Sequence, residues 1–231
     1  MQDIRAITLD LDDTLWEIHP VIRRAEQTLY QWLTDNYPRI TEKFTPDDMR
    51  DVRSQVVLEF ADMSHDLTFM RRTVLSRVGS AAGYSDDFID EAFAVFDAAR
   101  NAVELFPEVI PALESLQANF RLIAVTNGNA SLERIGIDHL FHDFITAASA
   151  GAAKPAQLIF DVAVSAGGAT PATTLHVGDH PHYDVDGARV AGLRTAWVNR
   201  TSAVWPDDLP RPEVEVTHVG ELARMLLDAR K

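Results

Sequence analysis

The chain has no cysteine among its 231 residues. This absence excludes disulfide bonds, thiolate metal sites and cysteine nucleophiles. The first residues also lack the basic and apolar segments of a secretory signal, and no apolar run approaches the ~18 residues of a membrane helix. We therefore expect a cytoplasmic protein without a membrane span, in which any covalent catalysis uses a nucleophile other than sulfur.

Basic residues are scarce, with 21 Lys and Arg against 35 Asp and Glu, which gives a formal net charge of −14. Such a charge repels nucleic-acid backbones and anionic lipids, so we expect neither as a partner. A small phosphorylated metabolite would require a local positive field from a divalent cation, a lysine or helix N-termini. We expect a monomer or a weak homodimer.

Short apolar, β-branched runs predict buried strands, and they alternate with segments of helical periodicity. The length suits one α/β domain with a modest insertion. The alternation predicts a parallel sheet with helices on both faces. The predicted strands span 4–9, 122–125, 175–177 and 195–198, with an edge strand at 144–147, and the predicted helices span 107–119, 155–166, 184–191 and 218–229.

The segment between the first two predicted strands is far too long for one crossover helix. Its apolar positions follow a helical period, with helices predicted at 21–37, 46–60, 67–78 and 86–99. We therefore predict a core domain formed by residues 1–17 and 103–231, and an inserted helical domain at residues 18–102.

Polar side chains follow the predicted strands at their carboxyl ends, which is the edge where parallel sheets bind ligands. Asp10 and Asp12 follow the first strand. In extended backbone, side chains two residues apart point the same way, and such a carboxylate pair can divide the work of nucleophile or metal ligand and of general acid and base. A cluster of turn or helix-capping aspartates is the alternative.

The other strand ends carry complementary groups. Thr126, with the amides around Gly128, suits hydrogen bonding to a phosphoryl oxygen, and Lys154 supplies a compact positive charge. Asp179 and Asp184 offer the hard oxygen ligands that Mg²⁺ prefers. Taken singly, these residues also fit an ordinary turn, a solvated lysine and loop acids.

In combination these segments resemble the motifs of the haloacid dehalogenase superfamily over nearly the whole chain. The resemblance implies a Rossmann-like, doubly wound parallel sheet with an inserted α-helical cap. The residues that carry it are Asp10-Leu11-Asp12-Asp13-Thr14-Leu15, Thr126-Asn127-Gly128, Lys154-Pro155, Gly178-Asp179 and Asp184-Val185-Asp186-Gly187-Ala188.

The resemblance also implies a mechanism. Asp10 would take the phosphoryl group, while Asp12 would protonate the leaving oxygen and then activate water. Thr126 and Lys154 would hold the phosphoryl oxygens, together with Asn127 and Gly128 of the same motif.

The same resemblance implies a Mg²⁺ site. Its ligands would be Asp10, the main-chain carbonyl of Asp12, and Asp179, with Asp184 binding through water or orienting the other ligands.

Within the superfamily, the chain is similar to a bacterial branch that dephosphorylates flavin mononucleotide and 5-amino-6-(5-phosphoribitylamino)uracil. Other metabolites such as phosphoglycolate or a sugar phosphate stay open, as does a phosphomutase reaction. Dehalogenases of the superfamily have no acid two residues after the nucleophile, so Asp12 argues against that reaction. An inactive binding or regulatory member would be expected to lack Asp10, Asp12 or Lys154.

Side chains in and near the predicted insertion are candidates for recognising the leaving group of the substrate. Trp16 and Phe69 could stack on a heterocycle, and Arg71 and Arg72 could meet an anion or ring carbonyl. Packing within the lobe is the alternative for the aromatic pair, and solvation for the arginines.

Three histidines near the third strand end, His176, His180 and His182, suggest a zinc site. His176 lies in a predicted strand, and the other two occupy a loop beside hard oxygen ligands, so zinc is disfavoured. His180 or His182 could instead line the entrance to the site.

Overall fold

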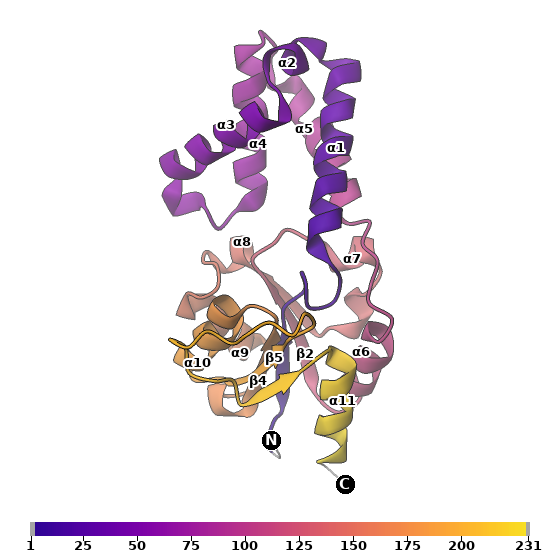
Figure 1. Ribbon diagram of the computed structural model, residues 1–231, viewed down its shortest axis with the longest axis vertical. Coiled ribbons are helices and arrows are strands. Elements are labelled where there is room, and N and C mark those ends of the chain that lie inside the picture. The colour runs from indigo at the N-terminus through magenta and orange to yellow at the C-terminus, as the bar shows by residue number, and fades with distance from the viewer. Residues whose placement is uncertain (1–2, 230–231) are drawn as a thin grey trace. The chain divides into compact units, whose positions relative to one another are not determined.

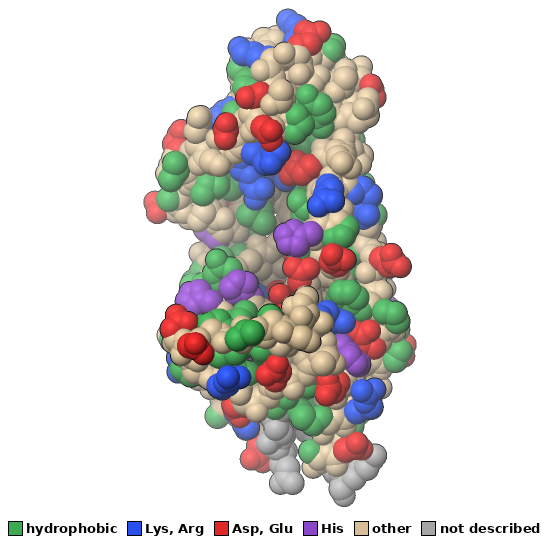
Figure 2. All heavy atoms as spheres, viewed as in Figure 1, with side chains coloured by type: hydrophobic (Ala, Val, Ile, Leu, Met, Phe, Trp, Pro, Cys, Tyr) green, Lys and Arg blue, Asp and Glu red, His purple; other side chains and the backbone are tan. Residues whose placement is uncertain are grey.

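The computed structural model describes residues 3–229 and divides into two compact units (Figure 1). The larger unit combines Met1–Glu17 with Glu104–Lys231, and the smaller one is Ile18–Val103. Within the described residues, every helix is too short or too polar to cross a membrane. On the face drawn in Figure 2, basic side chains are interspersed with acidic ones.

The larger unit is built on a six-stranded sheet in which every neighbouring pair is parallel. The strand order β3-β2-β1-β4-β5-β6 reverses direction between β1 and β4, as in Rossmann-like sheets. The predicted fold class is confirmed. The strands are β1 (Ala6–Leu9), β2 (Arg121–Thr126), β3 (Asp143–Thr146), β4 (Thr174–Gly178), β5 (Arg194–Val198) and β6 (Val214–Val216).

Helices cover both faces of this sheet, which explains why its central strands are continuous apolar runs. The helices α6 and α11 pack together on one face, and α9 and α10 lie on the other (Figure 1). The helices of this unit are α6 (Val109–Gln117), α7 (Leu132–Ile135), α8 (Ala147–Ala150), α9 (Gln157–Ala166), α10 (Gly187–Val190) and α11 (Val219–Asp228).

The smaller unit is helical and has a core of its own. The helices α1 and α5 pack along each other, and α3 packs on α4. The short helix α2, which begins at Pro38, lies between the helices predicted at residues 21–37 and 46–60 and was not itself predicted. Proline fits the first turn of a helix, where its missing N–H has no helical acceptor. The helices are α1 (Ile18–Asn36), α2 (Pro38–Lys43), α3 (Pro46–Glu59), α4 (Leu67–Ala81) and α5 (Ile89–Arg100).

The segment predicted as one helix at residues 184–191 starts differently in the structure. A π-helical turn, η5 (Pro181–Asp186), precedes α10. His180 caps this turn, because its Nδ1 accepts hydrogen bonds from the backbone N–H groups of His182 and Tyr183 at 3.2 and 3.1 Å. The wider turn places Asp184 beside Asp10 and Lys154 instead of on an outer helix face.

Candidate active site

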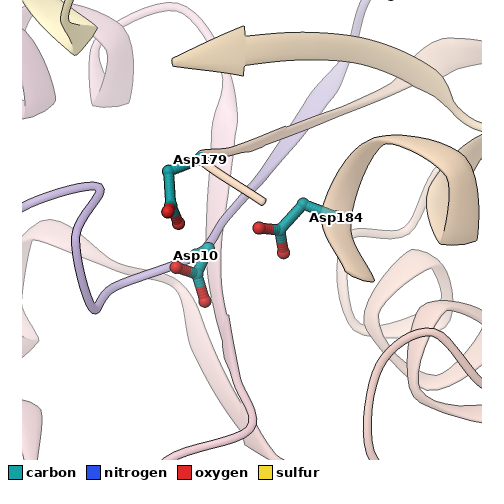
Figure 3. Close-up of side chains that lie close together, drawn as sticks. All are labelled: Asp10, Asp179 and Asp184. Atoms are coloured by element: carbon teal, nitrogen blue, oxygen red, sulfur yellow. The ribbon is translucent and has the colours of Figure 1, made fainter. Parts of the chain in front are cut away.

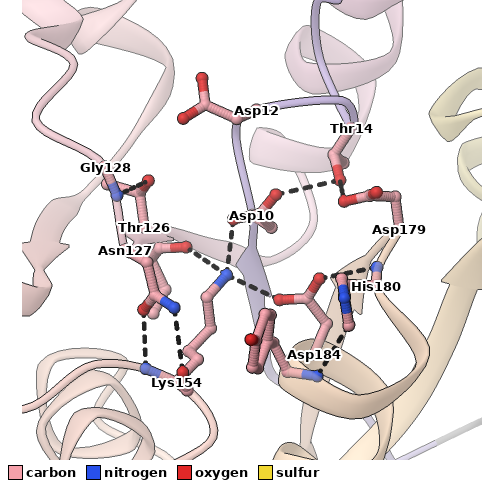
Figure 4. A network of polar contacts seen from close by, with 12 residues as sticks. Asp10, Asp12, Thr14, Thr126, Asn127, Gly128, Lys154, Asp179, His180 and Asp184 are labelled. Carbon is pink, nitrogen blue, oxygen red and sulfur yellow. Dashed lines mark hydrogen bonds and ion pairs between the residues drawn. The ribbon is translucent and has the colours of Figure 1, made fainter. Parts of the chain in front are cut away.

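Asp10 lies directly after β1, at the point where the strand order reverses. Its backbone N–H donates to the carbonyl of Val177 at 2.9 Å, which keeps the chain beside β4 beyond the last strand residue. The Lys154 ammonium donates to Asp10 Oδ1 at 2.5 Å, to Asp184 Oδ1 at 2.6 Å and to the Val125 carbonyl at 3.1 Å (Figure 4). All three charged side chains are buried.

Three carboxylates cluster here, and the Lys154 ammonium contacts two of them, Asp10 and Asp184. Oxygen atoms of Asp10, Asp179 and Asp184 all lie within 4.8 Å of one another (Figure 3). Burial raises the pKa of Asp10 well above its usual range, and Asp184 and Asp179 add to this effect while Lys154 opposes it. Burial, with Asp184 and Asp13, raises the pKa of Asp179 to about 7. Without a further cation, burial and the neighbouring carboxylates therefore favour the protonated forms of Asp10 and Asp179.

Asp184 differs from the other two carboxylates because donors already occupy both of its oxygens. Besides Lys154, the His180 backbone N–H donates to Oδ2 at 2.9 Å, and His176 Nε2 lies 3.2 Å from Oδ1. Although burial acts in the opposite direction, Lys154 and His176 hold the pKa of Asp184 below its ordinary value. Asp184 is thus fixed as an anion that orients its neighbours, and Lys154 above all.

His176 and Thr8 complete this arrangement, and sequence analysis did not identify them as part of the site. His176 Nδ1 lies 2.8 Å from Thr8 Oγ1, and burial lowers the pKa of the imidazole. A neutral ring with its proton on Nε2 satisfies both neighbours. The only local signal is a polar residue at each of two positions inside otherwise apolar strands.

Gly178 allows Asp184 to approach the end of β4. A Cβ atom at this position would lie 2.3 Å from Asp184 Cγ, closer than any real contact. We expect Gly178→Ala to lower the unfolding free energy by about 1–3 kcal/mol and to reduce turnover, because Asp184 must move away from Lys154. Denaturant titration and steady-state kinetics measure the two effects.

Gly168→Ala is the matched control for this substitution. Gly168 has φ +59° and open space around its Cβ position, so an alanine there introduces backbone strain without crowding the site. Equal turnover in both variants would contradict the role assigned to Gly178.

The chemistry of these donors fits a hard divalent cation. Mg²⁺ prefers carboxylate oxygens, and a cation would favour the ionised forms of Asp10 and Asp179, whose pKa values are raised by burial and by neighbouring carboxylates. Asp10 and Asp179 would hold the ion, with Asp184 beside them. The Asp12 side chain points away from this cluster (Figure 4), and a contribution from its main-chain carbonyl stays a prediction.

Asp12 is held by a residue of its own turn. Trp16 Nε1 donates to Asp12 Oδ1 at 2.9 Å, and the Asp13 backbone N–H donates to the Trp16 carbonyl at 2.7 Å. Asp13 adopts φ +60°, a left-handed conformation that Asp tolerates better than most residues. The Trp16 side chain is fully buried, so the structure makes it a support for Asp12, while stacking on a substrate stays a prediction.

The second predicted motif forms the neighbouring wall of the site. Thr126 Oγ1 accepts the Gly128 backbone N–H at 2.8 Å. The Asn127 side chain donates to the Lys154 carbonyl at 2.9 Å and accepts the Lys154 backbone N–H at 2.7 Å. The side chain of Asn127 therefore positions Lys154, and direct phosphate binding by this motif stays a prediction.

The predicted arginines of the insertion have partners within the smaller unit. Arg71 donates to both carboxylate oxygens of Glu26, at 2.7 and 3.2 Å, and its guanidinium lies 3.4 Å from the ring centroid of Phe96. Arg72 pairs with Asp90. These contacts fix both side chains locally, and their contact with a substrate stays a prediction.

Most of the chain matches a known protein family. Residues 4–192 match the family model described as haloacid dehalogenase-like hydrolase, so the chain belongs to this hydrolase family.

Individual relatives include phosphatases and 2-haloacid dehalogenases. The chain is 28% identical to 5-amino-6-(5-phospho-D-ribitylamino)uracil phosphatase YigB of Escherichia coli strain K12, over 96% of both chains. It is 27% identical to glyceraldehyde 3-phosphate phosphatase of Methanopyrus kandleri, over 99% of both. A crystal structure described as 2-haloacid dehalogenase from Pseudomonas syringae pv. Tomato DC3000 superposes with a TM-score of 0.92 at 35% identity, covering 98% of this chain and 99% of the other.

Proposed function

We propose that the protein is a Mg²⁺-dependent phosphomonoesterase that acts through an aspartyl-phosphate on Asp10. The observation that carries this proposal is the pairing of Asp10, in contact with Lys154, with a second carboxylate, Asp12, held separately by Trp16. An alkoxide that leaves phosphorus needs a proton, whereas a halide displaced from carbon does not. A dedicated acid two residues from the nucleophile therefore favours phosphate esters.

In the proposed reaction, a carboxylate oxygen of Asp10 attacks phosphorus while the bond to the ester oxygen breaks. Asp12 gives its proton to that oxygen, and the resulting carboxylate removes a proton from the water that hydrolyses the aspartyl-phosphate. Lys154 and Thr126 hold the phosphoryl oxygens. Asp10 and Asp179 would hold a Mg²⁺ ion, which would supply positive charge to offset that of the transferring group.

We propose a small phosphorylated metabolite as the substrate, with flavin mononucleotide and 5-amino-6-(5-phosphoribitylamino)uracil as the first choices. The similarity to YigB over nearly the full length of both chains supports this choice. The similarity to a glyceraldehyde 3-phosphate phosphatase supports a wider search that includes phosphoglycolate and sugar phosphates. We further propose a cytoplasmic monomer or weak homodimer.

The deciding experiment measures phosphate release from an aryl phosphate and from these metabolites, with Mg²⁺ and with EDTA. We expect turnover with Mg²⁺. With EDTA we expect turnover to fall at least 100-fold, on the order of the effect of removing one electrostatic contact to the transition state. Turnover that persists in EDTA would overturn the proposed mechanism. Conversion of a sugar phosphate to its isomer without phosphate release would indicate a mutase.

A 2-haloacid dehalogenase is the second candidate, because the 35%-identical structure carries that description. The same panel should therefore include 2-chloropropionate, with chloride release as the readout. Chloride release without phosphatase activity would favour this candidate.

The pKa of Asp179 predicts how Mg²⁺ binding depends on pH. Asp179 must lose its proton to bind a cation, and its pKa is raised to about 7. A carboxyl with a raised pKa binds more protons in the folded than in the unfolded state, so in EDTA its contribution to stability falls as pH rises from about 4 to 7. Mg²⁺ reverses this loss, because it binds the ionised form.

We therefore expect the increase in Tm on adding Mg²⁺ to be larger at pH 8 than at pH 6. Thermal unfolding at a fixed Mg²⁺ concentration measures this difference. Asp179→Asn should show little Mg²⁺ effect at either pH, and an equal Tm increase at both pH values in the wild type would contradict the prediction.

A further inference from the structure

Arg200 lies two residues beyond the end of β5 and makes three contacts with distant segments of the larger unit. Its Nη2 donates to the main-chain carbonyl of Thr14 at 3.1 Å and pairs with the Glu108 carboxylate. Its guanidinium carbon lies 3.6 Å from the centroid of the Phe106 ring, a stacking distance. The ion pair is well shielded, with side chains 20% and 24% exposed.

These contacts converge on the turn that follows the nucleophile. The Phe106 backbone N–H donates to the Leu15 carbonyl at 3.0 Å, and Trp16 forms a β-bridge with Leu105. Arg200 thus connects the same two segments, residues 14–16 and 105–108, through side-chain contacts. The main chain of Thr14 is held between β5 and the segment that leads into α6.

The side chain of Thr14 reaches the carboxylate cluster from this fixed position. Thr14 is fully buried, and its hydroxyl lies 3.3 Å from Asp10 Oδ2 and 3.4 Å from Asp179 Oδ1 (Figure 4). These two carboxylates are the groups that would hold the cation. A hydroxyl between them restrains the direction in which their remaining lone pairs point.

We propose that Arg200 is a positioning residue for the cation site and acts through Thr14. This inference rests on the proposed Mg²⁺-dependent function. Within the described residues, Arg200 Nε is buried without a hydrogen-bond partner. An apolar side chain could cover Phe106 without leaving a buried donor unsatisfied, so packing alone does not account for an arginine here. Its ion pair with Glu108 and its donation to the Thr14 carbonyl do, and the second of these contacts reaches the turn that carries the Thr14 hydroxyl.

Isothermal titration of the full-length protein with MgCl₂ tests this role without relying on activity. We expect Arg200→Ala to weaken Mg²⁺ binding about 10-fold, the lower end of effects from residues behind a metal ligand. Arg200→Lys should restore part of the affinity, because an ammonium can donate to Thr14 but cannot stack as a planar group on Phe106. Circular dichroism and Tm verify folding, and Arg200→Lys and Arg200→Gln replace the alanine variant if it does not fold.

Arg194→Ala is the matched control. Arg194 is the first residue of β5, at the strand end opposite to Arg200, and it pairs with Glu213, with side chains 31% and 41% exposed. Its loss should leave the Mg²⁺ affinity unchanged.

A double-mutant cycle tests whether Arg200 affects Mg²⁺ binding through Thr14. Thr14→Val removes the hydroxyl and keeps the shape, so in this background Arg200→Ala should cause no further loss of Mg²⁺ affinity. Wild-type affinity in the Arg200 variants, or an undiminished Arg200 effect in the Thr14→Val background, would overturn the inference. A wild-type protein that binds no Mg²⁺ would instead overturn the proposed metal dependence, and this inference with it.

Discussion

Asp10→Asn is expected to lower kcat for phosphate release by roughly 10⁴- to 10⁶-fold, the range for loss of a covalent nucleophile. An amide oxygen has almost no nucleophilicity toward phosphorus, and neither Asp184 nor Asp12 is placed to replace Asp10. Asp184 is occupied by Lys154, His176 and the His180 backbone, and the Asp12 side chain points away from the cluster. Steady-state kinetics with an aryl phosphate measure the loss.

The same variant should fold as well as the wild type. Because the pKa of Asp10 is raised in the folded state, its charge is unfavourable there without a cation. The Tm of Asp10→Asn in EDTA at pH 8 should therefore be no lower than that of the wild type.

Asp13→Asn is the control for this experiment, since it makes the same chemical change in the same turn, and Asn tolerates φ +60°. It should retain most of the activity. Turnover by Asp10→Asn near the wild-type rate, after mass spectrometry has excluded deamidation, would show that another group is the nucleophile.

Asp12→Asn is expected to lower kcat by roughly 10²- to 10⁴-fold, the usual contribution of a general acid and base. The asparagine oxygen can still accept the Trp16 N–H, which lies 2.9 Å from Asp12 Oδ1, so the substitution removes proton transfer and keeps the local structure. Kinetics with two esters separate the two roles of Asp12.

With an aryl phosphate, the leaving oxygen departs without help, so formation of the aspartyl-phosphate should be affected much less than with an alkyl phosphate. Hydrolysis of the intermediate should then be slow, and a burst of phenol release should precede the steady state. Equal losses for both esters and no burst would contradict the assignment of Asp12. Trp16→Phe is a useful companion, because it keeps Asp12 and removes only the hydrogen bond that holds it.

The structure brings together those candidate residues for which a local sequence pattern combines with a general rule of topology. Asp10, Thr126 and Asp179 each lie within two residues of the end of a predicted strand. In a parallel sheet these ends share one edge, and the structure brings Asp10 and Asp179 together there, with Lys154 between Asp10 and Asp184. No long-range information was needed beyond the strand assignments.

The residues that hold these side chains in place could not be predicted in the same way. Arg200 contacts Thr14 across 186 sequence positions, and no local periodicity relates the two. The side chain of Asn127 has a partner in the main chain of Lys154, so its residue type alone suggested substrate contact. His176 was considered as a zinc ligand, but the structure surrounds it with Thr8, Asp184 and Phe160.

The position of the smaller unit in the chain has a consequence for how the sheet assembles. β1 and β2 pair in register from Ala6 and Arg121, so all of Ile18–Val103 lies in the loop that must close to join them. Closing a flexible loop becomes only about 0.6 kcal/mol harder with each doubling of its length. Because Ile18–Val103 has its own apolar core, it can contract before that closure. The pairing of β1 with β2 is therefore the step of sheet assembly that depends most on the folding of a segment outside the sheet.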